Sequence, residues 1–355
     1  NGYYMARYVD KWGKRQAKRF IKLQDCRRWI ADRMYDNRHS DIRNLPTITV
    51  DHWYEQWISI RQKTVKQGSV INYNRVYHNH IQPILGNMLL CEVKSFHCQL
   101  VLNTMGEKGY KNSTIKNVKE VMFNIFNYAY DNDAIPSNPC KKSVKSNVGK
   151  ESEPREVMTR TTQKEFYEHI DASKYGDHYR FILQTGLRVG ELSGLKWQDI
   201  DFSNRIIRVT HNLEYYAEAG GWIEGTPKTQ AGIRTIPLTD EAMMILKKQK
   251  DMSIISFQWK DNVFLDAEGR PIRDATYNYD LTTICKAAKI PNISMHILRH
   301  TFATRCIEAG MKPKTLQKLL GHASIAITMN LYVHTTEDEK RREIDMVADS
   351  LLLAL

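Results

Sequence analysis

The sequence lacks the features of a membrane protein and of a disulfide-rich secreted protein. No apolar run approaches the roughly 18 residues that span a bilayer, and the longest apolar cluster at the end of the chain is only Leu351–Leu355. The six cysteines include no C-x-x-C pair, which argues against a zinc knuckle and against a disulfide framework. We therefore expect reduced, mostly buried thiols in a cytoplasmic protein, with no membrane partner and no metal site.

The length and the charge distribution point to several domains and a polyanionic partner. At 355 residues the chain exceeds the size at which single cores usually stop growing, so two or three domains are expected. Residues 1–44 hold 12 Lys and Arg against 5 Asp and Glu, residues 45–150 hold 13 against 7, and the rest hold 27 against 28. The whole net charge of +12 thus comes from the first 150 residues. This concentration favours nucleic acid binding over an evenly solvated surface.

The first 44 residues show a hairpin pattern followed by a helix pattern. Residues 3–9 and about 14–23 indicate two strands around a turn signal at Asp10–Gly13. Apolar residues between Cys26 and Met34 then recur at helical spacing. The strands carry the basic residues that we expect to contact DNA, namely Arg7, Lys14, Arg15, Lys18 and Arg19.

Residues 45–140 show helical periodicity throughout. Three apolar stripes with helical spacing predict the core of a compact bundle of four short helices. The stripes are Val50, Trp53, Tyr54, Trp57 and Ile58; Val70, Tyr73, Tyr77 and Ile81; and Ile115, Val118, Met122, Ile125, Phe126 and Ala129. Basic residues of the loops and helix ends are expected to face DNA, namely Lys63, Lys66, Arg75, Lys111, Lys116 and Lys119.

The segment 141–154 is polar, basic and rich in turn-forming residues, which indicates a linker. A mixed α and β domain is expected to follow and to open at a capping box, Thr162–Glu165. Helices are expected to about residue 195, then a strand over 206–211, a hairpin over 222–238, and further helices. The residues after 335 predict a tail helix whose apolar stripe packs either on its own domain or on a neighbouring protomer.

Five short patterns supply the groups that cleavage of a phosphodiester without metal requires. These groups are a nucleophile, donors to the non-bridging oxygens and an acid for the leaving oxygen. The patterns are Arg188-x-x-Glu191-Leu, Pro227-Lys228-Thr229, His296-x-x-Arg299-His300, Leu320-Gly321-His322 and Thr328-x-x-x-Tyr332. Each residue taken singly is more often a core or surface residue. Their order and spacing together point to a shared site.

Local geometry adds expectations for the two arginines. Arg188 follows a break at Thr185–Gly186, so it is expected to begin a helix, with Glu191 one turn later placed to hold its guanidinium. Arg299 and His296 lie three residues apart on one helical face, where two groups can converge on one phosphate.

The last two patterns place a histidine and a tyrosine. Gly321 predicts a helix stop, so His322 is expected to project from a turn. Tyr332 is the candidate nucleophile, because neighbouring cations would stabilise its phenolate.

Taken together, these motifs resemble those of the tyrosine recombinases, the phage- and transposon-type integrases. The resemblance implies a multidomain protein that forms a C-shaped clamp on DNA. Its parts would be a small basic ββα arm-binding domain at 1–44 with a truncated first strand, an all-α core-binding domain at 45–140, a linker at 141–154, a mixed α+β catalytic domain at 155–335 and a C-terminal tail helix at 336–355.

The resemblance also implies a role for each motif residue. The implied catalytic set is Arg188, Lys228, His296, Arg299, His322 and Tyr332. Tyr332 would form a 3′-phosphotyrosyl link, and Lys228 in the turn of a β-hairpin would protonate the leaving 5′ oxygen. Arg188 and Arg299 would act on the non-bridging oxygens, with Glu191 supporting Arg188. No metal, ATP or other cofactor is implied, and His300 is expected to pack.

The implied function is integration and excision of a mobile element. A homotetramer on double-stranded attachment-site DNA would exchange strands through a Holliday junction in the bacterial cytoplasm, at the nucleoid, with an excisionase or a host DNA-bending factor as further partners. A type IB topoisomerase and a chromosome-dimer resolvase remain as alternatives. A non-enzymatic DNA-binding protein of this fold would be expected to have lost a catalytic position, and the basic N-terminal segment favours an integrase over a resolvase.

Overall fold

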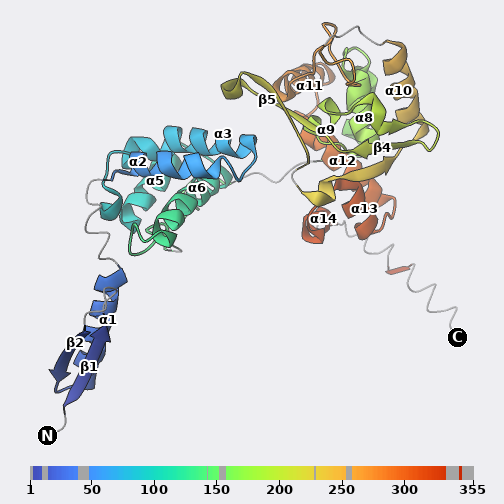
Figure 1. Ribbon diagram of the computed structural model, residues 1–355. Helices are drawn as coiled ribbons and strands as arrows, with labels where there is room; N and C mark the ends of the chain where they lie inside the picture. Colours follow the sequence, from blue (N-terminus) through green and yellow to red (C-terminus); the bar gives the residue numbers. More distant parts are fainter. Residues whose placement is uncertain are drawn as a thin grey trace, which may run out of the picture. The chain divides into compact units, whose positions relative to one another are not determined.

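The structure is a computed structural model, and it describes residues 3–9, 15–38, 48–141, 143–151, 157–227, 229–252, 258–332 and 344–345. The chain divides into two compact units, residues 1–154 and 155–355 (Figure 1). Across these ranges, none of the helices has both the length and the apolar character that crossing a bilayer requires.

The N-terminal region forms the expected ββα arrangement. Strand β1 (Tyr4–Val9) pairs antiparallel with β2 (Arg15–Phe20), and α1 (Leu23–Arg38) follows. Ala6 and Cys26 are buried between hairpin and helix, and the rings of Phe20 and Trp29 lie 6.0 Å apart. The prediction that the second strand continues to Leu23 is wrong: the strand ends at Phe20, because Leu23 already begins the helix that covers the hairpin.

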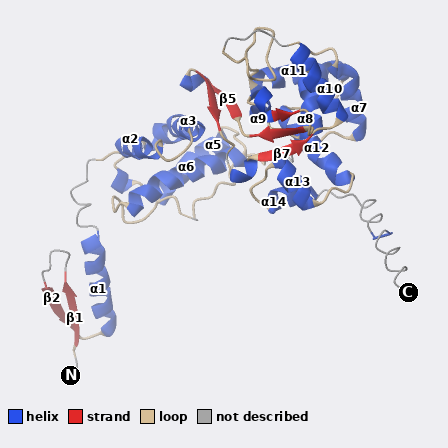
Figure 2. Ribbon diagram, turned by 45° about the vertical axis from the view of Figure 1, so that its right-hand side comes forward, coloured by secondary structure: helices blue, strands red, loops and turns tan. Residues whose placement is uncertain are grey.

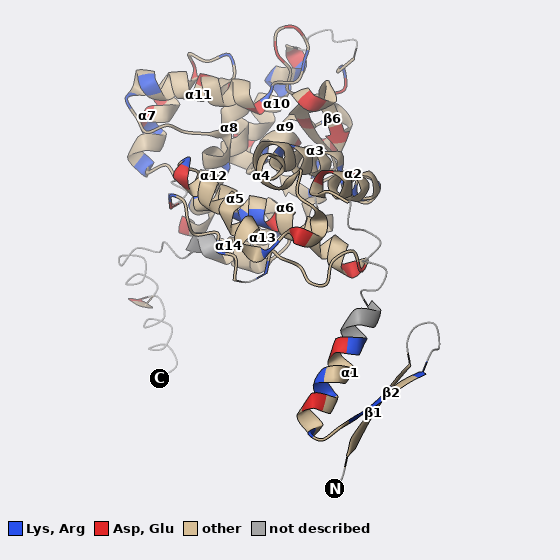
Figure 3. Ribbon diagram, turned by 90° about the vertical axis from the view of Figure 1, so that its left-hand side faces the viewer, with Lys and Arg blue, Asp and Glu red and all other residues tan. Residues whose placement is uncertain are grey.

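The register of the hairpin places its arginines on one face. Side chains alternate between the two faces of a strand, and directly opposite residues share a face. Arg7 lies opposite Ala17, Val9 opposite Arg15 and Met5 opposite Arg19. Arg7, Arg15 and Arg19 are exposed and lie on the face opposite to the buried Ala6. Figure 3 marks the Lys and Arg positions of the hairpin and of α1 in blue. Lys14 lies outside the described residues.

The bundle expected from the apolar stripes is confirmed. Its elements are α2 (Val50–Arg61), α3 (Gln67–Val76), a π-helical turn (Tyr77–Ile81), α4 (Gln82–Leu85), α5 (Ser95–Glu107) and α6 (Asn112–Asp131). Helix α3, the π-helical turn and α4 follow one another without a break. The described residues 48–141 therefore contain four main helical segments. Tyr54 stacks on Tyr77 with 3.5 Å between ring centroids, and the Tyr77 hydroxyl donates to Asp51 at 2.6 Å. The α6 stripe, including Ile115 and Phe126, is fully buried.

Much of the segment expected to be a linker packs on this bundle. Val144 is buried, and its carbonyl accepts a hydrogen bond from the Lys119 ammonium. The Gly149 amide donates to the Asn112 side chain at 2.8 Å. Apolar Val144 therefore holds the described residues 143–151 against the helices, although the composition around it is polar.

The second unit combines helices with short strands (Figure 2). Its elements are α7 (Arg160–Ile170), α8 (Gly176–Thr185), α9 (Val189–Ser193), β3 (Ile200–Asp201), β4 (Ile206–Val209), β5 (Asn212–Tyr216), β6 (Gly221–Gly225), β7 (Arg234–Pro237), α10 (Asp240–Asp251), α11 (Asp274–Ala288), α12 (Met295–Glu308), α13 (Pro313–Leu320) and α14 (Ile325–Tyr332). Helix α8 packs against α10 and α12, and its Phe181 and Ile182 are fully buried in the core. The expected mixed α and β class is confirmed.

Two local predictions for this unit are wrong. Residues 222–238 do not form one hairpin, because β6 pairs with β5 whereas β7 pairs with β4 in the sheet β3-β4-β7. The chain reverses between β5 and β6 instead, where Gly220 adopts a left-handed conformation. Helix α7 is capped by Thr159, whose hydroxyl accepts from the Thr162 amide at 3.0 Å. Because this earlier threonine can serve as the cap, the helix begins before the predicted capping box.

The predicted tail helix falls almost entirely outside the described residues. Of residues 336–355, only Ile344 and Asp345 are described.

Candidate active site

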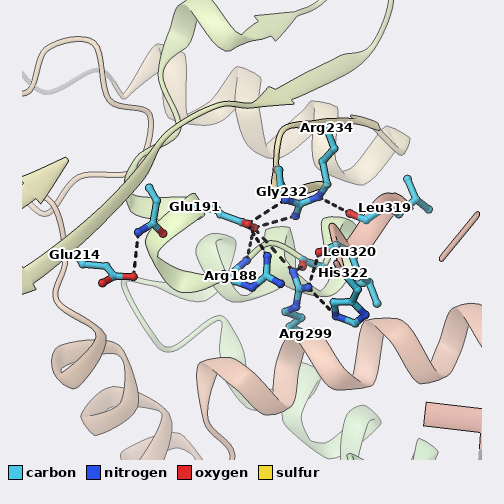
Figure 4. Close-up of polar contacts among 11 residues, drawn as sticks. Arg188, Glu191, Glu214, Gly232, Arg234, Arg299, Leu319, Leu320 and His322 are labelled. Carbon is cyan, nitrogen blue, oxygen red and sulfur yellow. Dashed lines mark hydrogen bonds and ion pairs between the residues drawn. The ribbon is translucent and has the colours of Figure 1, made fainter. Parts of the chain in front are cut away.

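A single buried carboxylate, Glu191, organises the candidate site (Figure 4). Its Oε1 accepts hydrogen bonds from Nη1 of Arg188 at 2.8 Å and Nη1 of Arg234 at 2.9 Å. Its Oε2 accepts from the Arg188 backbone amide at 2.9 Å and from Nη2 of Arg234 at 2.8 Å. Nη1 of Arg299 lies 3.9 Å from the same oxygen. Three guanidinium groups thus surround one carboxylate.

The backbone before Arg188 explains how this cluster begins. Helix α8 is followed by Gly186, whose φ of 64° is in the left-handed region that favours glycine. A Cβ there would also lie 2.4 Å from the Phe302 ring, so the turn has no room for a larger residue. Arg188 then caps α9, and Glu191 closes back on the Arg188 amide. The prediction that Arg188 begins a helix and is held by Glu191 is confirmed.

The charges in the cluster shift one another's protonation. Burial raises the pKa of Glu191, but the hydrogen bonds and charge of Arg234, with the charges of Arg188 and Arg299, outweigh it and lower the pKa to about 2. Burial and the charges of Arg188 and Arg234 lower the pKa of Arg299 to about 9, against the opposing effect of Glu191. At neutral pH, three cations therefore face one anion, and the remaining positive charge suits an incoming phosphate.

The two predicted phosphate-binding arginines have different environments. The Arg188 side chain is 40% exposed, whereas the Arg299 side chain is only 4% exposed. Arg299 donates to the carbonyl oxygens of Gly186 and Leu320 and to Nε2 of His322, the last at 3.2 Å. Arg299 thus joins the ends of α8 and α13 while Arg188 is open to solvent.

His322 projects from a turn, as predicted. Gly321, with φ of 64°, ends α13 in the left-handed region. The Nδ1 atom of His322 lies 3.0 Å from the Thr328 hydroxyl. Because Arg299 can only donate, Nε2 of His322 accepts, and Nδ1 is assigned the proton that it donates to Thr328. Burial, then the charges of Arg299, Arg188 and Arg234, lower the pKa of His322 to about 4, so the ring is neutral at pH 7.

His296 is exposed in the first turn of α12, three residues before the buried Arg299. Its ring meets the ring of His300 edge-on, with centroids 4.4 Å apart and planes at 86°. The packing role expected for His300 agrees with this contact. His296 and Arg299 have the spacing of three residues from which convergence on one phosphate was predicted. The His296 side chain is exposed, however, and the Arg299 side chain is buried.

Two predicted catalytic residues are described only in part or not at all. Tyr332 is the last residue of α14, a helix that packs against α12 and α13. Nothing is described of the Tyr332 side chain. Lys228 lies outside the described residues, in the connection between β6 and β7.

The basic residues predicted to contact DNA in the helical bundle differ in exposure. Lys63, Lys66, Arg75, Lys111 and Lys116 are exposed. Lys119 is half-buried, and its ammonium donates to the Val144 carbonyl. Lys119 therefore already supports the packing of the segment after α6.

Comparison with protein families identifies the chain. Residues 150–339 match the phage integrase family, and residues 49–106 match the N-terminal SAM-like domain of phage integrases. The chain belongs to the phage integrase family. This family is the tyrosine recombinase family that the sequence motifs resemble, so the predicted membership is confirmed.

Individual relatives agree with this assignment. The chain is 34% identical over 255 residues to the transposase from transposon Tn916 of Enterococcus faecalis, covering 68% of the chain and 63% of the relative's length. It is 29% identical over 325 residues to a XerC-like tyrosine recombinase of Caldanaerobacter subterraneus, covering 85% of the chain and 83% of that protein. A solved structure of the Tn1549 transposon integrase with circular intermediate DNA superposes with a TM-score of 0.75 at 29% identity, covering 85% of this chain and all of that one.

Sequence reasoning missed one member of this candidate site and undervalued another. Arg234 was only one residue of the expected hairpin over 222–238, yet its guanidinium pairs with both carboxylate oxygens of Glu191. Thr328 was only a marker of the tyrosine motif, yet it is fully buried against His322. The available signal for Arg234 was its place two residues before the buried Ile236 in β7, because residues two apart share a face of a strand and a buried charge needs a partner.

Proposed function

We propose that the chain is a site-specific DNA recombinase that integrates and excises a mobile element by cleaving and rejoining DNA. The observation that carries the proposal is the cluster of Arg188, Arg234 and Arg299 around Glu191, with neutral His322 beside it. Such an arrangement holds fixed donors and excess positive charge near a phosphate before the reaction begins. The similarity to a Tn916 transposase and a Tn1549 integrase supports a mobile element as the source.

The proposed chemistry is a reversible transesterification. Tyr332 loses its phenolic proton to solvent, and its phenolate oxygen attacks the phosphorus. A 3′-phosphotyrosyl bond forms as the bond from phosphorus to the 5′ oxygen breaks. Lys228 gives a proton to the departing 5′ oxygen. Attack by the 5′ hydroxyl of a partner strand reverses these steps and joins the new strand.

The arginines would share the work on the non-bridging oxygens. Arg188, being the exposed member, meets the phosphate first. Arg299 would exchange one of its present acceptors, which include the Leu320 carbonyl and His322, for a phosphate oxygen. His296, exposed at the start of α12, would add a further donor.

The remaining parts would supply DNA contacts and assembly. We propose that the two units close around a duplex as a C-shaped clamp, and that four protomers exchange strands through a Holliday junction. Arg7, Arg15 and Arg19 on the open face of the hairpin would bind accessory arm sites. This basic region favours a mobile-element integrase over a chromosome-dimer resolvase. An excisionase or a host DNA-bending factor would set direction in the bacterial cytoplasm.

A nicked suicide substrate tests the proposal, because a covalent protein–DNA adduct accumulates when the cleaved strand is lost. Tyr332→Phe should abolish the adduct on a denaturing gel and leave DNA binding nearly intact, since only the nucleophilic oxygen is removed. Tyr279→Phe is the matched control, because Tyr279 is 78% exposed on α11. An adduct that persists in Tyr332→Phe would exclude Tyr332, and relaxation of supercoiled DNA without junction formation would instead favour a type IB topoisomerase.

A further inference from the structure

We propose that Arg234 is a positioning residue for phosphodiester cleavage, a role that rests on the function proposed above. Arg234 fixes the carboxylate of Glu191, and through it the guanidinium of Arg188, and it also holds the C-terminal end of α13. Its side chain is 5% exposed, and its Nε, Nη1 and Nη2 atoms all donate to Glu191 or to backbone carbonyls. Its influence on the reaction passes through the residues that it holds.

The first contact is a two-pronged ion pair. Nη1 and Nη2 of Arg234 donate to Oε1 and Oε2 of Glu191 at 2.9 and 2.8 Å. Parallel pairing of this kind fixes both the position and the plane of the carboxylate. Oε1 is the same atom that accepts from the Arg188 guanidinium at 2.8 Å. The direction in which Arg188 points therefore depends on how Arg234 orients Glu191.

The second contact joins the same guanidinium to α13. Nε of Arg234 donates to the Leu319 carbonyl at 2.5 Å, and Nη1 also donates to the Gly232 carbonyl at 3.0 Å. Leu319 is in the last turn of α13, directly before the segment Leu320–His322. The Leu320 carbonyl accepts from Arg299. One guanidinium thus links β7 and α9 to the helix end from which His322 emerges (Figure 4).

Gly321 shows how closely α13 approaches this arginine. A Cβ at Gly321 would lie 3.1 Å from both Cδ and Nη1 of Arg234 and 3.0 Å from the Ala231 carbonyl. The close approach and the left-handed turn both require glycine at this position. The end of α13 therefore packs so closely against the start of β7 that a side chain at position 321 would not fit.

A lysine at position 234 keeps the charge but loses the planar fork. One ammonium cannot reproduce the two parallel bonds to Glu191 and the bond to Leu319 in this geometry. The carboxylate is then free to turn among Arg188, Arg299 and the lysine. Because small misplacements of positioning groups cost about 100-fold in rate, cleavage should slow by about that factor while binding is retained.

Arg305 offers a matched control on α12. Its guanidinium also joins a glutamate and a backbone carbonyl, donating to Glu308 and to Met158, each at 2.7 Å. None of these three residues belongs to the Glu191 cluster. Arg305→Lys therefore removes a comparable structural fork without touching the candidate site.

The experiment compares Arg234→Lys and Arg305→Lys in the full chain. It measures DNA affinity by fluorescence anisotropy, melting temperature, and the rate constant of adduct formation on the suicide substrate at saturating DNA. We expect Arg234→Lys to lower the rate constant about 100-fold with affinity changed less than about threefold. Arg305→Lys should lower the melting temperature and leave the rate constant within about threefold of the wild type at a temperature where it is folded.

The pH profile separates positioning from simple destabilisation. Burial raises the pKa of Glu191, and without Arg234 only the charges of Arg188 and Arg299 lower it. The pKa of Glu191 should therefore rise from its present low value. The rate constant of Arg234→Gln should then fall as the pH is lowered, over a range in which the wild type stays constant. His322 also faces this cluster and titrates in acid. The double variant Arg234→Gln with Glu191→Gln distinguishes the two groups. A fall in rate constant at low pH that is caused by Glu191 disappears in this variant, whereas one caused by His322 remains.

The outcomes are distinct. A wild-type chain that forms no adduct overturns the proposed function and this proposal with it. Wild-type adduct formation with an unchanged rate in Arg234→Lys, or with an equal loss in Arg305→Lys, overturns the positioning role alone. If Arg234→Lys does not fold, Glu191→Asp shortens the same link from its other end. That variant must show the same loss of rate with retained affinity, or the proposal is wrong.

Discussion

The Nδ1 atom of His322 lies 3.0 Å from the hydroxyl of Thr328, one helical turn before Tyr332 on α14. On its other side, the same ring accepts a hydrogen bond from Arg299 at 3.2 Å. Thr328 is fully buried. The helix that carries the candidate nucleophile is therefore tied through one imidazole to the arginine cluster, and the bond also selects the tautomer of His322.

Thr328→Val should lower the rate constant of adduct formation. The change keeps the shape of the side chain but leaves Nδ1 of His322 without its acceptor, at a cost of about 1–3 kcal/mol. If that cost is added to the activation free energy of cleavage, the rate constant drops about 10- to 100-fold. Thr328→Ser keeps the hydroxyl and should stay near wild type in the same single-turnover assay.

Thr301→Val is the control for this prediction. Thr301 is also fully buried, and its hydroxyl bonds only the backbone, donating to Ile297 and accepting from Met158. It should lose stability without a specific loss of cleavage rate. Equal rates in Thr328→Val and wild type would show that the bond does not position the site.

Lys228→Ala should slow cleavage by about 10²- to 10⁴-fold, the usual contribution of a general acid. A substrate with sulfur in place of the bridging 5′ oxygen should restore the rate, because a thiolate leaves without a proton. Arg188→Ala should show no such rescue, since its donors act on non-bridging oxygens. If sulfur does not selectively rescue Lys228→Ala, another group is the acid.

Glu191→Gln should destabilise the second unit in a pH-dependent manner. The pKa of Glu191 is about 2 in the folded chain against an ordinary value of 4.5. The carboxylate therefore contributes stability that is fully present above about pH 4.5 and is lost as the pH falls toward 2. The linked free energy is about 3 kcal/mol at neutral pH. Denaturant unfolding at pH 7, 4.5 and 3 should show the difference between variant and wild type shrinking with acidity.

Two further histidines, the buried His178 and the partly buried His322, add their own loss of stability in acid. Burial lowers the pKa of His178 to about 3, and burial with the neighbouring arginines lowers that of His322 to about 4. Both proteins should therefore lose stability as the pH falls from about 6.5 toward these values. Glu191 raises the pKa of His322, so the difference between the two proteins reports the Glu191 carboxylate together with this coupling. A difference independent of pH would contradict the assignment. Glu308→Gln, which removes partly exposed ion pairs with Arg160 and Arg305, should cost less than Glu191→Gln, because such pairs contribute about 1 kcal/mol or less each.

Replacing Arg7, Arg15 and Arg19 together with Gln should weaken binding to arm-site DNA and reduce its salt dependence. Each phosphate contact contributes about 0.9 to the slope of log K against log salt, so the slope should fall in magnitude by about 2 to 3. Lys18→Gln should change the slope less. Lys18 pairs across the hairpin with Ala6, so it lies on the same face as Ala6, away from the three arginines, and its ammonium is near the Phe20 ring. Adduct formation on a core site should be unchanged. Equal losses of arm binding and core cleavage would show that the hairpin belongs to the core fold.

Local sequence rules succeeded where the cause of structure is itself local. The Ile115 to Ala129 stripe predicts α6 because helical spacing gathers its apolar side chains on one face. The break at Gly186 and the stop at Gly321 predict their turns because both residues adopt left-handed backbone angles. By contrast, the hairpin expected over 222–238 does not form, because β6 pairs with β5 through a reversal at Gly220 and β7 pairs with β4. Strand pairing depends on which distant segment offers a partner, and no local signal records that.

By itself the sequence determined the family and the order of the domains and named most of the candidate residues, because the order and spacing of motifs can be read without knowing any contact. Only the tertiary structure decided which side chains meet. Arg234 is 43 residues from Glu191 along the chain, and Arg299 is 113 residues from the Gly186 carbonyl that it contacts. These meetings depend on how β7, α12 and α13 pack around α9, and the same packing buries Arg299 and leaves Arg188 exposed. Burial and convergence are properties of the packed unit, so the roles of Arg234 and Thr328 became visible only there.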